Sequence, residues 1–119
     1  MAEHNELGKI GEKLAIDFLL KSDYKILETN YRYLKAEVDI IAQKGEILAA
    51  VEVKTRSSDY FEEPQDAVKE KKIKLLVSAI DYYVVEKDLD VEVRFDIIAI
   101  IHQKNKTKIE HLEDAFLHF

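Results

Sequence analysis

The sequence contains no cysteine, no tryptophan, one proline and three glycines among its 119 residues. Without cysteine the chain can form neither disulfides nor thiolate metal sites, and such a composition suits a reducing cytoplasm. No apolar run approaches the roughly 20 residues that a membrane-spanning helix needs. The first residues are polar and acidic, so no secretory signal is expected. These absences predict a cytoplasmic protein that does not span a membrane.

Basic residues are fewer than acidic ones. The chain has 18 Lys and Arg against 24 Asp and Glu, which gives a net charge of −6 with neutral His. Proteins that bind long stretches of duplex nucleic acid through its phosphates usually have more basic than acidic residues. The overall balance therefore argues against a nucleic-acid partner. Carboxylates that bind a metal ion are an exception, because the positive charge of the ion offsets their negative charge.

The length fits one domain, residues 1–119, and no internal repeat, low-complexity tract or linker interrupts it. Apolar periodicity predicts helices over residues 6 to about 21 and 64 to about 86. Runs rich in aliphatic and aromatic residues predict strands over 24–34, 37–42, 47–54, 93–101 and 107–112. This order, α-β-β-β-α-β-β, predicts an α/β fold with a mixed central sheet flanked by helices.

Charged residues interrupt two of the apolar strands. Side chains alternate across a strand, so Glu37 and Asp39 share one face of the second predicted strand, and Glu52 and Lys54 share one face of the third. With residues 44 and 45 as the loop between the strands, Glu37 lies opposite Glu52 and Asp39 lies diagonal to Glu52. A four-residue loop keeps this register, whereas a three-residue loop sets Asp39 opposite an apolar partner.

In the register with an even loop, three carboxylates and one ammonium group converge. Like charges opposite each other destabilise a sheet, so either Lys54 and nearby cations neutralise the carboxylates or a metal ion does. Oxygen ligands without cysteine suit Mg²⁺ or Mn²⁺. A lysine beside such an ion can orient the attacking water and offset developing charge, as phosphodiester hydrolysis requires. The alternative is a solvated rim of charges, the usual meaning of Glu52-Val53-Lys54 taken alone.

Basic residues follow the third strand and gather near the start of the second helix. Arg56, Lys69 and Lys72 are the candidates for contacts with phosphates beside the carboxylates. The alternative is a solvated helix face. Arg94 and Asp96, two residues apart on a strand, predict a structural ion pair, and the apolar end of the chain from Ala115 is expected to dock on the core or on a partner.

Several short motifs run in order along nearly the whole chain: GKIGEKLA at 8–15, NYR at 30–32, EVDIIA at 37–42, VEVKTR at 51–56, QDAV at 65–68 with Lys72, RFD at 94–96 and AF at 115–116. Together they resemble the YraN-like family of small bacterial endonuclease-like proteins. Asp39 followed by Glu52-Val53-Lys54 resembles the signature of the PD-(D/E)xK nuclease superfamily. The resemblance implies a restriction-endonuclease-like αβββαβ core, in a layout similar to that of the Holliday-junction resolvases.

The resemblance also implies residue roles. Asp39 and Glu52 would be metal ligands assisted by the Val53 carbonyl, and Lys54 would be the catalytic lysine. Glu12 falls where related nucleases carry a glutamate on the first helix that faces the site. The alternative for Glu12 is a charge in an early helical turn that stabilises the helix.

The function implied is a Mg²⁺- or Mn²⁺-dependent endodeoxyribonuclease acting on branched or flapped DNA by structure rather than by sequence, with a homodimer as one form. Two departures from the family pattern bear on this. Ala36 and Glu62 each stand where the family usually has glycine, and an acid at 62 would repel a phosphate backbone. The alternative function is a weak or inactive nuclease-fold module that binds nucleic acid or a protein partner.

Overall fold

The computed structural model describes residues 2–57, 69–104 and 106–116, without the side chains of residues 2–5. The elements follow in the order α1 (Ala2–Lys21), β1 (Lys25–Tyr33), β2 (Ala36–Lys44), β3 (Ile47–Arg56), α2 (Glu70–Glu86), β4 (Glu92–Gln103) and β5 (Lys106–Leu112). The predicted order of helices and strands is confirmed. It is compatible with a restriction-endonuclease-like αβββαβ core followed by one further strand.

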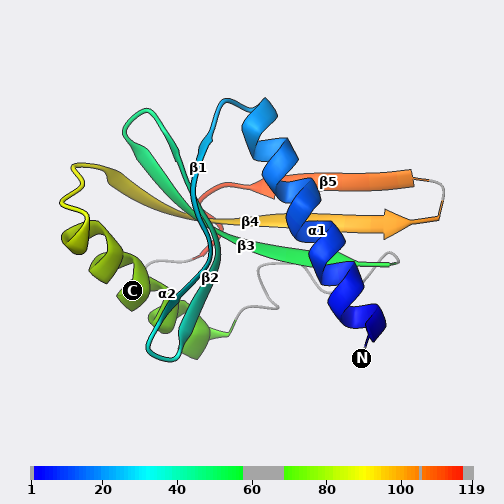
Figure 1. The fold of residues 1–119 in the computed structure, drawn as a ribbon, viewed down its shortest axis with the longest axis horizontal. Helices are drawn as coiled ribbons and strands as arrows, with labels where there is room; N and C mark the ends of the chain where they lie inside the picture. Colours follow the sequence, from blue (N-terminus) through cyan, green and yellow to red (C-terminus); the bar gives the residue numbers. More distant parts are fainter. Residues whose placement is uncertain (1, 58–68, 105, 117–119) are drawn as a thin grey trace.

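The five strands form one mixed sheet in chain order from β1 to β5. β3 and β4 are parallel and are joined across α2, whereas the other neighbouring strands are antiparallel. Figure 1 shows that the pair β1 and β2 turns steeply away from the direction of β3, β4 and β5. The sheet therefore changes direction between β2 and β3, which is where the candidate site lies.

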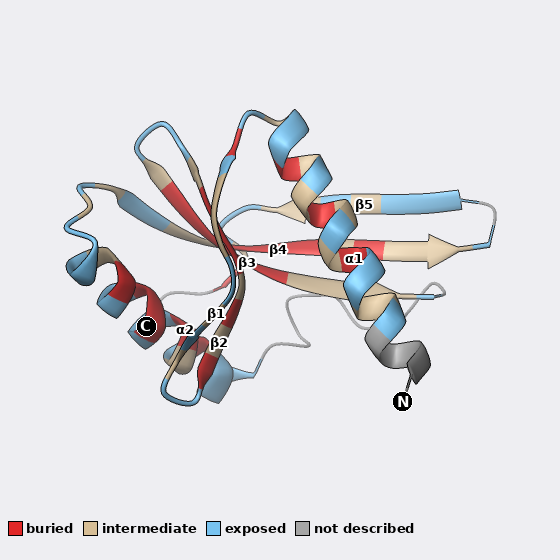
Figure 2. Ribbon diagram, in the orientation of Figure 1, coloured by how far each residue is buried: buried red, intermediate tan, exposed pale blue. Residues whose placement is uncertain are grey.

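The two helices cover opposite faces of this sheet. One buried cluster joins α2 to one face through Val38, Leu48, Ala50 and Ile97 among others. The second cluster joins α1 to the other face through residues such as Ile40, Val51 and Ile98. Figure 2 shows the buried residues concentrated in the middle of the sheet and on the inner sides of the helices. Strands covered on both faces explain the nearly continuous apolar runs in their sequence.

The face that α1 buries is centred on Gly11, Ala15 and Leu19, at the four-residue spacing of a helix. Ile10, which the apolar pattern also places on the buried face, is 40% exposed. A Cβ atom on Gly11 would lie 1.8 Å from the Thr55 side-chain oxygen. The missing side chain of Gly11 thus lets α1 lie directly against the end of β3.

The loop between β2 and β3 differs from the predicted one. Lys44 pairs with Ile47, so the loop residues are Gly45 and Glu46, with Gly45 at a positive φ of 60°. This moves the register by two residues, because the glycine occupies the first loop position. The cross-strand partners therefore change. Along β2 the simple alternation of faces also breaks, because Val38 packs on the α2 side of the sheet and Ile40, two residues later, on the α1 side.

The second helix begins later than the sequence pattern predicts. Lys69 is extended, with φ −77° and ψ 155°, and α2 starts at Glu70. Pro64, where the pattern places the start, lies outside the described residues, as do Glu62 and the motif at 65–68. At the other end of the chain Phe116 is 8% exposed and packs with the α2 cluster, so the predicted docking of the apolar end is confirmed as far as this residue.

A buried polar network ties β4 to β5. Asp96 is fully buried and accepts hydrogen bonds from Arg94 at 2.9 Å and from the Asp114 backbone N–H at 3.0 Å, and its carboxylate lies 2.8 Å from the His111 ring. Burial alone would raise the pKa of Asp96, but these partners hold it below its ordinary value. The predicted Arg94–Asp96 ion pair is confirmed, and Tyr24 also contacts Arg94.

In the part of the chain that the structure describes, no helix is long and apolar enough to cross a membrane.

Candidate functional site

Asp39 lies at the point where β2 and β3 separate. Their pairing ends with Ile40 opposite Val51. Beyond this pair, the backbone N–H of Val53, two residues after Val51, donates to Oδ2 of Asp39, the residue before Ile40, at 2.8 Å. The Asp39 carboxylate therefore takes the place of a strand partner. The N–H and C=O of a strand residue point to the same side, so the Val53 carbonyl also faces this gap.

Glu52 is an ionisable residue whose side chain lies in the protein interior. Its side chain is 2% exposed, and Oε2 lies 2.5 Å from the Lys72 ammonium. The other oxygen, Oε1, is buried and receives no hydrogen bond from a donor among the described residues, while the Glu52 carboxyl group lies within hydrogen-bonding reach of the Asp39 carboxyl group. Burial and then the charge of Asp39 raise the pKa of Glu52 to about 7, against the opposing effect of Lys72. With a proton on Glu52 the two carboxyl groups can share a hydrogen bond, whereas with both ionised the buried oxygen lacks a partner, which is expensive.

The carboxyl groups of Asp39 and Glu52 are neighbours. Burial raises the pKa of Asp39, while the Val53 N–H, Lys72, Glu52 and Lys54 lower it. The Lys54 charge lowers the pKa of both carboxyl groups, and Lys54 lines one pocket together with Asp39. Burial would lower the pKa of Lys72, but its ion pair with Glu52 raises it. The structure thus brings together Asp39, Glu52 and Lys54, as the sequence predicts, and adds Lys72.

A pocket of about 340 Å³ opens beside this group on the α1 side and is called the Glu12 pocket here. It is lined by Leu7, Gly8, Glu12, Asp39, Val53, Lys54, Thr55 and Arg56. Glu12 accepts a hydrogen bond from the Asn30 amide at 3.1 Å. Burial raises the pKa of Glu12, and Asp39 and Glu37 add to the rise against the Asn30 hydrogen bond. Glu12 therefore faces the site from the first helix.

A second pocket, of about 420 Å³, opens on the α2 side and is called the lysine pocket here. Its lining comprises Lys35, Ala36, Glu37, Asp39, Lys69, Lys71, Lys72, Leu75 and Leu76. Asp39 lines both pockets. The two pockets therefore flank one carboxylate, which lies at the junction of β2 and β3.

The predicted convergence of three carboxylates is wrong. Glu37 does not lie opposite Glu52, because the loop falls at residues 45 and 46. Its side chain is 40% exposed and lies 3.6 Å from Arg32. Among the described residues no group of three or more His, Cys, Asp and Glu side chains is placed to hold a metal ion. The protein groups available here as metal ligands are the carboxylates of Asp39 and Glu52 and the carbonyl of Val53.

The sequence pattern predicts phosphate contacts for Lys72 but does not predict its ion pair with Glu52. A usable signal was present. Lys72 lies four residues before Leu76 and next to Ile73, which are both buried, so it occupies the edge of the buried stripe of α2. A glutamate within an apolar strand needs a cation at that depth. Asn30, which holds Glu12 and adopts a φ of 53°, gave no comparable signal.

The residues present fit a divalent cation with oxygen ligands. Mg²⁺ binds one or two protein carboxylates and keeps several waters, so a third acidic ligand is not required. The buried Glu52 Oε1 has an unfilled place for one more partner, and Asp39 and the Val53 carbonyl face the same gap. Mn²⁺ accepts the same oxygen donors.

Comparison with known proteins places the chain in a family. The model of the uncharacterised protein family UPF0102 matches residues 11–100, a range that includes Glu12, Asp39, Glu52 and Lys72. The chain belongs to this family. Its UPF0102 membership confirms the resemblance to the YraN-like family stated from the sequence motifs.

Relatives in the UPF0102 family match over almost their whole length. A UPF0102 protein of Christiangramia forsetii is 64% identical over 119 residues, which is all of both chains. A UPF0102 protein of Flavobacterium psychrophilum is 61% identical over the same span. One of Parabacteroides distasonis is 46% identical over 116 residues, 98% of this chain and 96% of the relative. The description UPF0102 names a family and no reaction.

Proposed function

We propose that this chain is a divalent-metal-dependent endodeoxyribonuclease that hydrolyses phosphodiester bonds. The observation that carries the proposal is the buried, unpartnered Oε1 of Glu52 beside the carboxylate of Asp39. A buried carboxylate beside a half-buried one destabilises a fold when both are ionised, unless a cation compensates them. Lys72 supplies one positive charge, and it contacts only Oε2 of Glu52.

In this proposal Asp39, Glu52 and the Val53 carbonyl hold Mg²⁺ or Mn²⁺. The bound ion would supply Lewis acidity to the phosphate and a more acidic water. The Val53 N–H fixes the Asp39 carboxylate, because it occupies one of the two oxygens. The other Asp39 oxygen would then be available as a ligand to the ion.

Lys54 and Glu12 act from the Glu12 pocket. The Lys54 ammonium would lie against the phosphate and offset negative charge that develops on its oxygens. Glu12, held by Asn30, would orient a water on the same side. The raised pKa of Glu12 makes its carboxylate a stronger proton acceptor than that of an ordinary glutamate.

DNA as substrate follows from the family resemblance, and the local charge supports it. Although the net charge of the chain is −6, four lysines line the lysine pocket beside Asp39. Lys69 and Arg56, one at each pocket, are positioned for contacts with phosphates that flank the cleaved bond. The absence of cysteine agrees with a cytoplasmic setting, where such DNA is found.

A second function is a nuclease-fold module that binds without hydrolysis. The Lys72–Glu52 ion pair favours it, because a lysine already compensates one of the carboxylates without a metal. This alternative requires DNA binding that does not depend on a divalent cation and leaves the DNA intact.

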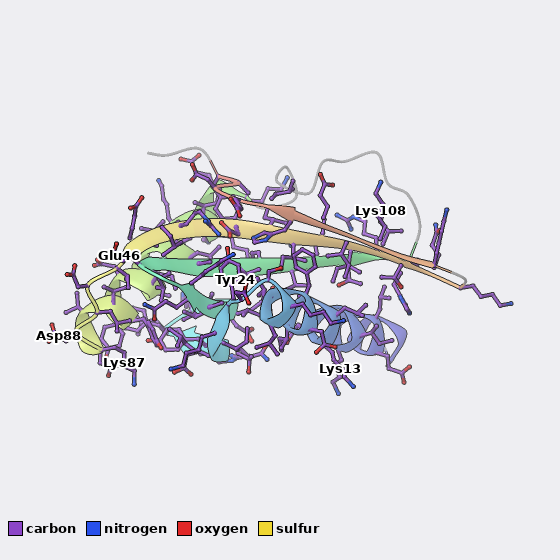
Figure 3. All side chains as sticks on the ribbon, turned by 90° about the horizontal axis from the view of Figure 1, so that it is seen from above. Lys13, Tyr24, Glu46, Lys87, Asp88 and Lys108 are labelled. Atoms are coloured by element: carbon purple, nitrogen blue, oxygen red, sulfur yellow. The ribbon has the colours of Figure 1, made fainter. Side chains whose placement is uncertain are left out.

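The test is incubation of the full chain with flapped, branched and linear DNA at low salt, with Mn²⁺ or with EDTA. Cleavage should require Mn²⁺ and should fall by roughly 10²-fold or more in Lys54→Ala, the size of loss typical of a charge-stabilising group. Lys13→Ala is the control, since Figure 3 shows Lys13 on the outer side of α1, away from the sheet. Intact DNA in every lane, with binding retained in EDTA, would favour the binding module.

A further inference from the structure

The lysine pocket contains lysines that are not paired with the carboxylates of the metal site. Lys72 is paired with Glu52, but Lys35, Lys69 and Lys71 form no ion pair with another residue that the structure describes. All three are exposed at the pocket rim. Against them stand Glu37, which pairs with Arg32, and Asp39, which is fixed by the Val53 N–H. The pocket is therefore suited to an anion, in a chain that is acidic overall.

Below this rim the pocket has an apolar floor. Leu76 is 3% exposed, Leu75 is half-buried, and Ala36 at the start of β2 is 5% exposed. A cationic rim above an apolar floor fits a ligand with a flat apolar part and a negative charge. A nucleotide has both, because its base is apolar on its faces and its phosphate is anionic.

The size of the pocket limits what can enter it. At about 420 Å³ it lies at the lower end of the range of roughly 300 to 1,000 Å³ that holds small ligands. A base that remains paired and stacked in a duplex cannot reach into such a pocket, whereas an unpaired base can. The pocket shares Asp39 with the metal site, so a nucleotide in it would adjoin the cleaved bond.

We propose that the lysine pocket is a subsite for one unpaired nucleotide next to the scissile phosphate. Its base would lie on Leu75 and its phosphate between Lys35 and Lys71. The enzyme would then select DNA with a single-stranded segment at the cleaved position and discriminate against continuous duplex. This inference rests on the proposed nuclease function and deepens it by assigning the substrate class to named residues.

Binding without metal tests the subsite apart from catalysis. Fluorescence anisotropy in EDTA measures the affinity of the full chain for a labelled oligothymidine and for a duplex of equal length. The variant Lys35→Ala/Lys71→Ala removes two exposed lysines of the subsite that are not metal ligands. The matched control is Lys13→Ala/Lys21→Ala, which removes two exposed lysines of α1 outside both pockets.

The wild type should bind the single strand more tightly than the duplex. The subsite variant should lose roughly tenfold in single-strand affinity. Its slope of log affinity against log salt should become shallower by about 0.7, since the subsite holds one phosphate and each neutralised phosphate on a single strand contributes roughly this amount. The control should change neither the affinity nor the slope by a comparable amount.

Equal affinity for both DNA forms, or a subsite variant that behaves like the control, overturns the subsite. If the wild type also cleaves duplex and flapped DNA equally well with Mn²⁺, the nuclease function stands and only the subsite fails. If the wild type neither binds nor cleaves any DNA, both proposals fail.

Discussion

Replacing Glu52 by glutamine should stabilise the protein at alkaline pH when no metal is present. Glu52 is 2% exposed, and its pKa of about 7 stands well above the ordinary value of 4.5. At about 1.4 kcal/mol per pH unit, this rise corresponds to roughly 3 kcal/mol by which folding disfavours the ionised form. The glutamine has nearly the same shape as the protonated glutamate and does not ionise.

The sign follows from proton binding. Between pH 4.5 and 7 the folded protein retains a proton on Glu52 that the unfolded chain has released, so the stability of the wild type falls as pH rises through this window. Glu52→Gln lacks that loss. Its advantage over the wild type should be close to zero near pH 4.5, grow through the window, and level off at about 2 to 3 kcal/mol above pH 7.5.

Urea unfolding in EDTA, followed by far-ultraviolet circular dichroism from pH 4.5 to 8.5, measures this difference. Glu46→Gln controls for the removal of one negative charge from an acidic chain, because Glu46 is exposed in the β2–β3 loop. A Glu52→Gln variant that is destabilised equally at pH 5 and pH 8 would refute the reasoning. It would mean that the Lys72 ion pair outweighs the burial of the charge.

Other positions give independent predictions. Leu34→Asn should stabilise the fold by about 1 kcal/mol in urea unfolding, because Leu34 is 85% exposed at a φ of 55°, a conformation that asparagine tolerates better; an unchanged midpoint would contradict this. Gly11→Ala should destabilise the fold by about 1 to 3 kcal/mol, because the added Cβ atom clashes with Thr55. Gly8→Ala should stabilise the fold slightly, because nothing lies within 4 Å of a Cβ atom there. Equal shifts of the melting temperature in the two variants would refute the close approach of α1 to β3. Asp96→Ala should cost about 3 to 5 kcal/mol, since its buried arginine and histidine partners lose their acceptor, and a loss below 1 kcal/mol would show that the network is dispensable.

The strands and their faces could be predicted from the sequence because local patterns determine them. Apolar runs and the alternation of side chains indicated which residues of β3 share a face, whereas in β2 the alternation breaks between Val38 and Ile40. Glycine at position 45 marked the loop between these strands but did not fix which residues form it. A shift of two residues leaves the faces unchanged, so Asp39 and Glu52 still meet, whereas Glu37 loses its predicted partner.

The parts that the sequence could not supply depend on contacts between distant segments. Lys72 reaches Glu52 because α2 crosses the sheet at a particular angle, and no local pattern sets that angle. The separation of the part of β2 before Ile40 from the part of β3 after Val51 likewise comes from the bend of the whole sheet. Ile10 was placed on the buried face by periodicity alone, but the contact of Gly11 with Thr55 rotates the buried face toward Ala15 and Leu19.

The central claim is that Asp39 and Glu52 share a divalent cation, and direct binding of Mn²⁺ tests it most directly. Electron paramagnetic resonance of free Mn²⁺, titrated with the full chain at neutral pH, reports the bound fraction. We expect saturable binding by the wild type that is lost in Asp39→Asn and retained in Glu37→Gln, whose carboxylate pairs with Arg32 instead. Binding that survives in Asp39→Asn, or a wild type that binds no Mn²⁺ at millimolar concentration, would contradict the account.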